Sequence, residues 1–175
     1  MGFDECGANP RWVNVVTFRL GEYACGMPIE SIVKILNVVK ITPIPELKGE
    51  IEGIIEVDGG VVPVISLRQY FSLPGLPFHI ESPIIVATTG GNKIGLVVDQ
   101  VLDVVFQPSS DISQQGDTVP PEFGMMPLLK GVVQSDGGPV YLLAPDCLYT
   151  PRQISLFMAR VGEYASHTFD QARDC

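Results

Sequence analysis

The sequence predicts an all-β protein made of two copies of one small five-stranded barrel, followed by a short C-terminal helix. Charged residues make up only 18% of the chain and hydrophobic residues 46%, and the 18 glycines and 15 prolines favour short strands and tight turns. Many apolar segments are rich in β-branched residues with partial alternation, which is typical of half-buried strands. The third observation, an internal repeat, defines the elements.

The clearest repeat is a hairpin. The segment GIIEVDGGVVPVISLRQYF begins at Gly53, and GVVQSDGGPVYLLAPDCLY begins at Gly131, 78 residues later. Both contain Asp-Gly-Gly, which supplies the positive φ angles that a tight hairpin turn requires. The identical pairs are Gly53/Gly131, Asp58/Asp136, Gly59/Gly137, Gly60/Gly138 and Val62/Val140.

The segments upstream also match. GMPIESIVKIL from Gly26 overlays GLVVDQVLDVV from Gly95 at a spacing of 69, and Glu30 overlays Asp99. A strand and a turn precede each one, VVTFRLGEYAC in the first half and IIVATTGGNKI in the second. The apolar spacing in 26–36 fits one helical turn, but its β-branched content favours a twisted strand. Each unit therefore has the strand content of an SH3-like or OB-like barrel.

These units predict one domain over 13–150, with 13–75 and 82–150 as pseudo-repeated barrels and 1–12 as a flexible N-terminus. The different spacings place an insertion, with the composition of a surface loop, at 107–127. The segment 151–175 is predicted to form a short amphipathic helix and a tail. The helix is expected to pack on its own barrel, with a partner as the alternative. Its apolar residues at helical spacing are Ile154, Phe157, Met158 and Val161.

The charge excludes several function classes. The formal net charge is −9, with only 11 Lys and Arg, whereas a protein that binds nucleic acid or an anionic membrane needs clustered positive charge. No apolar run approaches the roughly 20 residues that span a bilayer, so no membrane insertion is expected. The polar, acidic N-terminal sequence does not resemble a secretory signal, which favours a cytoplasmic protein.

The sequence predicts no catalytic, cofactor-binding or metal site. The four cysteines form no CxxC, and Cys25 and Cys147 lie in apolar surroundings typical of core residues. Neither His79 nor His167 lies near residues that suggest a catalytic triad. The segment 90–95, GGNKIG, lacks the Ser or Thr and the helix of a phosphate loop. A seam between two barrels, lined with Ile and Val, instead favours binding of an amphipathic helix or helical hairpin.

The blocks VVTFRLGEYACGMPIESIVKIL, ITPIP, GEIEGIIEVDGGVVPVISLR and IIVATTGGNKIGLVVDQVLDVV, in this order, resemble the CheW family of bacterial chemotaxis coupling proteins over roughly Val13 to Tyr149. The resemblance implies two intertwined five-stranded barrels around a shared core. It also implies a non-enzymatic adaptor, a monomer outside the array. In that family the chemoreceptor's cytoplasmic signalling tip docks between the barrels, and the regulatory domain of a CheA-type histidine kinase meets the barrel ends.

The resemblance carries the partner-binding groove over to six apolar positions: Val16, Ile29, Ile32, Ile35, Val101 and Leu102. Two departures from the family stand out. The family hairpin usually reads N-L-R-G, but residues 56–59 read EVDG, and an acidic residue that often pairs with that Arg is replaced by Lys34. We hypothesise that Lys34 and Asp58 form a charge-reversed pair at the rim of the groove, the alternative being two solvated residues. The second departure is Ser66, where the family commonly has Asp.

Three alternatives remain open at this point. The first is an accessory CheW-like scaffold of a non-flagellar motility or regulatory pathway. The second is a small-ligand-binding double barrel that uses the cleft between the barrels. An oligonucleotide-binding barrel is the third, although the acidic charge counts against it.

Overall fold

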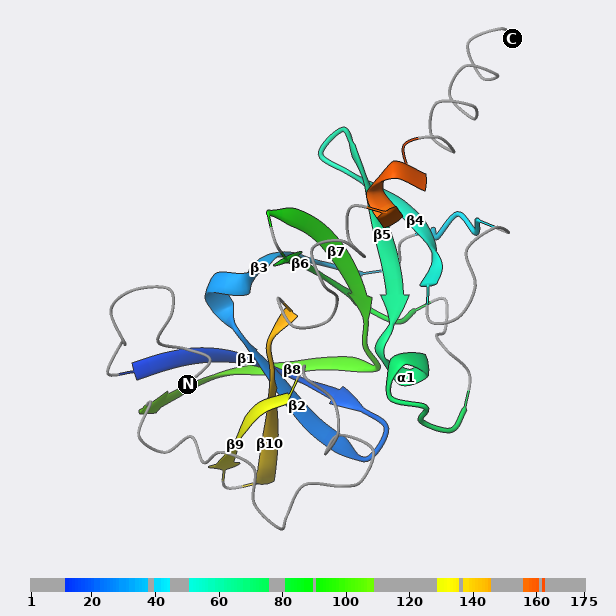
Figure 1. Ribbon diagram of the computed structural model, residues 1–175. Coiled ribbons are helices and arrows are strands. Elements are labelled where there is room, and N and C mark those ends of the chain that lie inside the picture. Colours follow the sequence, from blue (N-terminus) through cyan, green and yellow to red (C-terminus); the bar gives the residue numbers. More distant parts are fainter. Residues whose placement is uncertain are drawn as a thin grey trace, which may run out of the picture.

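The computed structural model describes residues 12–37, 40–44, 51–75, 81–89, 91–108, 129–135, 137–145, 156–160 and 162. Strands account for most of these residues (Figure 1). In chain order the elements are β1 (Trp12–Leu20), β2 (Tyr23–Pro28), the 3-10 turn η1 (Ile29–Ser31), β3 (Ile32–Leu36), β4 (Ile51–Val57), β5 (Gly60–Ser66), α1 (Leu67–Tyr70), β6 (Ile84–Thr89), β7 (Asn92–Val97), β8 (Gln100–Pro108), β9 (Leu129–Ser135) and β10 (Gly138–Leu143).

The strands form two five-stranded sheets, which confirms the all-β prediction. Sheet A has the order β8-β1-β2-β10-β9, and sheet B has the order β3-β6-β7-β5-β4. The segments 13–75 and 82–150 repeat in sequence, but each sheet takes two strands from one of them and three from the other. The two halves thus exchange β3–β5 and β8–β10 reciprocally.

Register shows that the exchange is symmetric. In the parallel pair of sheet B, Val64 lies opposite Gly95, and in the parallel pair of sheet A, Leu142 lies opposite Gly26. These pairs are equivalent under the repeat found in the sequence. Glycine is needed at this position because a Cβ on Gly26 would lie 2.4 Å from Val15 Cγ1. The repeat in the sequence is therefore matched by a repeat in the strand pairing.

The apolar residues form one large core between the sheets and a smaller core inside each. The large cluster, called the shared core here, contains Phe18 and Met27 from sheet A together with Ile65 and Ile85 from sheet B. Inside sheet B, Leu36 of the edge strand β3 packs against a cluster that includes residues of β4, the other edge strand. Sheet B thus has a core of its own, as expected of an SH3-like barrel, and the two barrels are joined by the core that they share.

The described segments confirm most predicted elements. The ambiguous segment 26–36 contains the strand β3, preceded by the single 3-10 turn η1. The first hairpin turn has positive φ at Asp58 (51°) and Gly59 (79°), as its sequence requires. The helix α1 was not predicted. It begins after Ser66, which is buried and whose Oγ accepts a hydrogen bond from Gln69 N at 3.3 Å.

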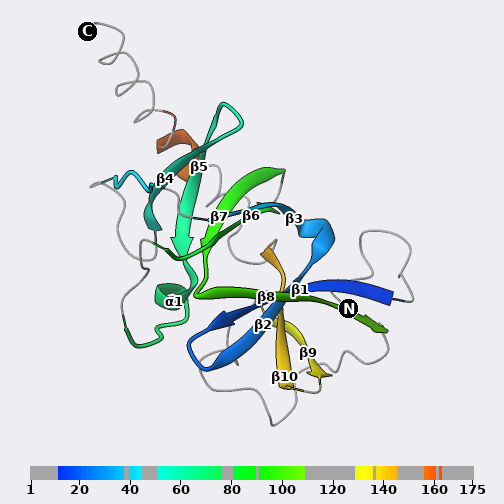
Figure 2. The same cartoon turned by 180° about the vertical axis from the view of Figure 1, so that it is seen from behind.

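The observed boundaries of two strands differ slightly from the predicted ones. Strand β1 begins at Trp12, inside the segment expected to be flexible, and β8 continues to Pro108, into the expected insertion. Residues 156–160 are helical and lie beside β4 and β5 in both views (Figures 1 and 2). Phe157 and Met158 pack against the shared core, as predicted for a helix on its own barrel. Residues 1–11, 109–128, His79, Cys147, Ile154, Val161 and His167 lie outside the described residues.

Candidate functional site

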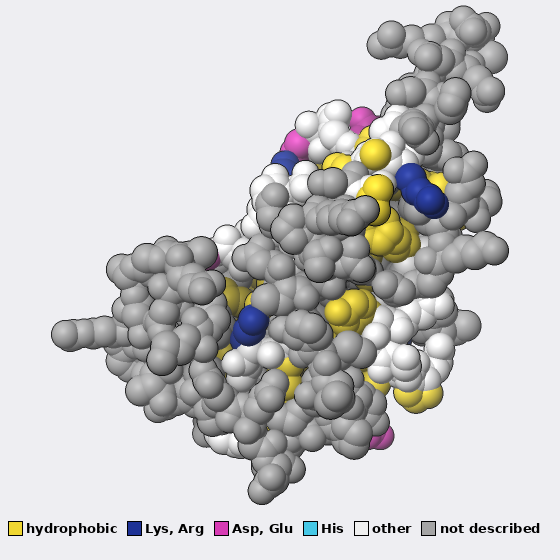
Figure 3. Space-filling view, viewed as in Figure 1, with side chains coloured by type: hydrophobic (Ala, Val, Ile, Leu, Met, Phe, Trp, Pro, Cys, Tyr) yellow, Lys and Arg dark blue, Asp and Glu magenta, His cyan; other side chains and the backbone are white. Residues whose placement is uncertain are grey.

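Large hydrophobic side chains reach solvent mainly along two edge strands. Within the described residues they come from η1 and β3 in sheet B, from β8 in sheet A, and from the C-terminal helix. Figure 3 shows hydrophobic side chains at the surface of one face, in several patches through its middle. Isolated exposed apolar residues are ordinary, but a grouping on edge strands indicates an interaction surface. The exposed residues are Ile29, Val33, Ile35, Leu102, Val104, Phe106 and Leu156.

Three of the six groove residues carried over from the family belong to this exposed set. Ile29 is 40% exposed, Ile35 38% and Leu102 40%. Ile29 lies on η1, Ile35 on β3 and Leu102 on β8. All three are therefore available to a partner without any rearrangement of the barrels.

The other three groove residues are less accessible. Val16 is only 4% exposed, because β1 lies between β8 and β2 and Val16 is flanked by Val104 and Met27 on those strands. Its side chain is covered in this structure, and its place in the groove stays a prediction. Ile32 and Val101 are half-buried and pack against the shared core, so less of their surface is available to a partner.

On the two edge strands, sequence reasoning missed three exposed residues, Val33, Val104 and Phe106. The repeat contained the signal for two of them. At a spacing of 69, Leu102 is the counterpart of Val33, and Val104 is the counterpart of Ile35. Extending the groove symmetrically from one edge strand to the other would have included both.

Lys34 and Asp58 form an ion pair, which confirms that part of the hypothesis. Lys34 Nζ donates to Asp58 Oδ1 at 2.9 Å, and the two side chains are 36% and 58% exposed. The hydrogen bond and the positive charge of Lys34 lower the pKa of Asp58, and Lys93 adds a smaller effect of the same sign. The pair joins the edge strand β3 to the β4–β5 turn at one end of sheet B.

The counterparts of this pair in the second copy of the repeat are both acidic. The repeat pairs Lys34 with Asp103 and Asp58 with Asp136 in sequence, and Asp136 lies outside the described residues. Asp103 Oδ1 accepts a hydrogen bond from the backbone N of Val104 at 2.8 Å. A pair of opposite charges is therefore found in sequence in the first copy only.

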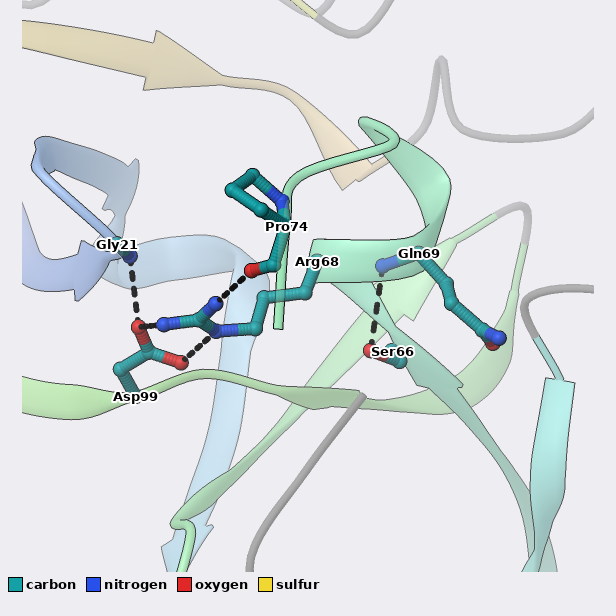
Figure 4. Close-up of polar contacts among 6 residues, drawn as sticks. All are labelled: Gly21, Ser66, Arg68, Gln69, Pro74 and Asp99. Carbon is teal, nitrogen blue, oxygen red and sulfur yellow. Dashed lines mark hydrogen bonds and ion pairs between the residues drawn. The ribbon is translucent and has the colours of Figure 1, made fainter. Parts of the chain in front are cut away.

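A second ion pair links the two sheets. Arg68 on α1 donates through Nε and Nη2 to the two carboxylate oxygens of Asp99, both at 2.6 Å (Figure 4). Asp99 also accepts from Gly21 N at 2.6 Å, and Arg68 Nη1 donates to Pro74 O at 2.5 Å. The carboxylate of Asp99 raises the pKa of Arg68 above its ordinary value. This network is called the Arg68–Asp99 clamp below.

Sheet A has an open hollow among the described residues. Its lining is mainly aliphatic and includes Val15, Val133 and Leu142. Among the described residues no group of three or more His, Cys, Asp or Glu is placed to hold a metal ion. No helix in the described segments is long and apolar enough to cross a membrane.

Comparison with known proteins agrees with this geometry. Residues 14–151 match the family of the CheW-like domain. The chain is 29% identical over 134 residues to "Chemotaxis protein CheW" of Thermotoga maritima, covering 75% of this chain and 84% of that protein. It is 31% identical over 123 residues to "Protein FrzA" of Myxococcus xanthus, covering 69% and 73%. "Protein PilI" of Pseudomonas aeruginosa is 24% identical over 134 residues, covering 76% and 73%.

Among solved structures, the chain is similar to the scaffolding protein TtCheW from Thermoanaerobacter tengcongensis. The TM-score is 0.71 at 28% sequence identity, and the match covers 78% of this chain and 92% of that one. The similarity thus extends over both sheets rather than over one barrel.

Proposed function

This chain belongs to the CheW-like domain family, and from that premise we propose that it is a non-enzymatic adaptor that couples chemoreceptors to a CheA-type histidine kinase. The observation that carries the proposal is the match over 14–151, which includes both barrels and the crossovers between them. A scaffold needs surfaces rather than reactive groups. The most distinctive surface features here are exposed apolar edge strands and one charged rim.

The apolar surface suits a helical partner. Ile29, Ile35 and Leu102 each expose about two fifths of their surface, and they belong to elements of both sheets. An amphipathic helix or helical hairpin, such as a receptor signalling tip, binds by inserting its apolar side chains among residues of this kind. We assign the receptor tip to this surface. The kinase regulatory domain is assigned to the barrel ends, and the adaptor is expected to act in the cytoplasm as a monomer outside the assembly.

The rim pair Lys34–Asp58 is assigned a role in partner choice. It lies at the end of sheet B, and it reverses the signs that the family commonly has at these positions. Charges at an interface rim favour partners of complementary charge and disfavour others. A partner of this chain is therefore expected to carry charges arranged differently from those of partners of the common form.

An accessory scaffold in a pathway other than flagellar chemotaxis is the second candidate. The charge reversal favours it, as do relatives named FrzA and PilI at identities similar to those of relatives named CheW. The two candidates share one biochemical activity, the bridging of a receptor and a kinase. They differ in which receptor and which kinase bind.

The test is titration calorimetry of the purified chain with a receptor signalling-tip fragment and with a kinase regulatory domain. Micromolar binding to both is expected. Ile29→Asp should raise the Kd for the receptor fragment by at least about tenfold, because it places a charge within an apolar contact. Leu156→Asp, a change at an exposed apolar residue on the C-terminal helix, is the matched control and should leave that Kd unchanged. Binding to neither partner would overturn the proposal.

A further inference from the structure

The chain passes between the two sheets at two equivalent places. It leaves sheet A through Pro28 and η1 to enter β3, and it leaves sheet B through Val98 and Asp99 to enter β8. At the spacing of 69 found in the sequence, Ile29 corresponds to Val98 and Glu30 to Asp99. These two crossovers are related by the repeat, so a symmetric molecule would present them alike.

They differ strongly in exposure. Ile29 is 40% exposed, whereas Val98 is 1% exposed and belongs to the shared core. Glu30 is exposed, whereas Asp99 is half-buried and accepts hydrogen bonds through both carboxylate oxygens. The crossover at Val98 and Asp99 is thus largely buried and is called the closed crossover. The crossover at Ile29 and Glu30 is exposed and is called the open crossover.

The Arg68–Asp99 clamp lies at the closed crossover. Arg68 extends from α1, which follows the last strand of the first hairpin in sheet B, and Gly21 lies in the β1–β2 turn of sheet A. Asp99 connects them, because it accepts from Arg68 and from Gly21 N together (Figure 4). Asp99 N also donates to Arg19 O at 3.0 Å. The clamp therefore ties the end of one sheet to a turn of the other.

The sequence does not repeat the Arg–Asp combination in the other copy. The repeat spacing of 78 pairs Arg68 with Asp146, and the spacing of 69 pairs Asp99 with Glu30. Two acidic residues cannot make the planar, two-bond contact that an Arg guanidinium makes with a carboxylate. Asp146 lies outside the described residues.

We propose that Arg68 and Asp99 are positioning residues for coupling: their clamp fixes the relative orientation of the two sheets at one crossover and so sets the shape of the open crossover, where Ile29 meets a partner. The proposal rests on the proposed function for the partner and on the observed geometry for the clamp. Both side chains are less than one quarter exposed, with relative exposures of 22% and 24%, so solvent competes little for these bonds. A rigid clamp at one crossover restricts tilting of the sheets at the other.

Residual dipolar couplings of backbone amides test the orientation in the free protein. In the wild type, one alignment tensor should fit the amides of both sheets. In Asp99→Asn, which keeps the size of the side chain but removes its charge, the couplings of the two sheets should no longer fit the wild-type relative orientation, and the Gly21 amide should exchange faster with solvent. Glu30→Gln is the matched control at the equivalent position and should leave the wild-type orientation intact.

Binding provides the second measurement. Asp99→Asn and Arg68→Gln should each raise the Kd for a receptor signalling-tip fragment by roughly tenfold, while Arg160→Gln, a charge deletion on the C-terminal helix, should not. Arg68→Gln also serves if Asp99→Asn fails to fold. Unchanged affinity in both variants, an unchanged orientation of the sheets, or loss of folding in both would overturn the inference. A wild type that binds neither partner would instead overturn the proposed function, whereas the orientation experiment would still decide what the clamp does.

Discussion

At the scale of single residues, the two ion pairs have different consequences. Lys34–Asp58 is exposed, and exposed pairs contribute little to stability, so its effect is expected in recognition. Arg68–Asp99 is partly buried, two-bonded and linked to two backbone groups, so its effect is expected in the arrangement of the sheets. Burial and geometry, rather than the number of ion pairs, separate these roles.

Reversing the rim pair should therefore change binding without changing folding. In the double variant Lys34→Asp, Asp58→Lys, the two side chains still attract each other, but the positive and negative charges have exchanged places. We expect the variant to fold with a slightly lower urea midpoint, because Lys tolerates the positive φ of residue 58 less well than Asp does. We also expect an altered preference among receptor or kinase fragments of different charge. The preference is measured by competition binding at low and high salt, because salt weakens contacts between exposed charges. Indifference of every partner to the double reversal would contradict a role in partner choice.

Gly53 is the residue at which the backbone tolerates least change. Its φ is 152°, and a Cβ there would lie 2.2 Å from Thr42 O, which accepts the hydrogen bond of Ile54 N. We expect Gly53→Ala to lower the free energy of unfolding by about 2–4 kcal/mol, measured by urea denaturation. Gly137→Ala is the control, because an added Cβ there meets nothing within 4 Å, and it should cost no more than about 0.5 kcal/mol. Equal effects of the two changes would show that the close approach to Thr42 does not matter.

At the scale of elements, the short helices were the hardest to predict. The hairpin strands follow from Asp-Gly-Gly turns between β-branched segments, and β4, β5, β9 and β10 lie where these signals place them. The repeated hairpin segment continues in sequence through Ser66 to Phe71, but the chain turns into α1 because Ser66 caps a helix. A single turn has no apolar periodicity of its own, so only the cap indicated it.

The C-terminal helix offers a comparison of two neighbouring residues. Phe157 packs against the shared core, whereas Leu156 is 58% exposed. Phe157→Ala should lower the free energy of unfolding by about 1–2 kcal/mol, less than the roughly 3–5 kcal/mol expected for a fully buried Phe, because Phe157 is only half-buried. Leu156→Ala should change it by less than about 0.5 kcal/mol. A larger loss for Leu156→Ala would mean that the helix packs through a different face.

At the scale of the whole molecule, the reciprocal exchange of strands makes the two barrels one folding unit. Neither half of the sequence contains a complete sheet, and the shared core draws residues from both sheets. Exchanged strands and a common core favour a single cooperative transition.

Fragments test this dependence. A fragment of residues 13–75 should remain unfolded by circular dichroism and amide dispersion, because it contains β1 and β2 without β8–β10, and β3–β5 without β6 and β7. The intact chain should unfold in one transition by both fluorescence and circular dichroism. A folded, cooperative 13–75 fragment would contradict the exchange of strands.

The exchange marks the limit of prediction from the residues themselves. The spacings of 69 and 78 identify equivalent strands, but equivalence does not say which strand pairs with which. Pairing depends on long-range packing, such as the approach of Val64 to Gly95 and of Leu142 to Gly26. The candidate site likewise contains one feature that could be predicted from the sequence and one that could not. The family resemblance, with both charges reversed, predicted the contact of Lys34 and Asp58, whereas the burial of Val16 depends on the packing of strands that are distant in sequence.

Bridging is the property that defines an adaptor, and it provides the most direct test of this account. A kinase regulatory domain is immobilised, and a labelled receptor signalling-tip fragment is passed over it with and without the purified chain. We predict that the receptor fragment is retained only when the chain is present, and that Ile29→Asp abolishes the retention while Leu156→Asp does not. Retention of the receptor fragment that is independent of the chain, or no retention with it, would contradict the central claim.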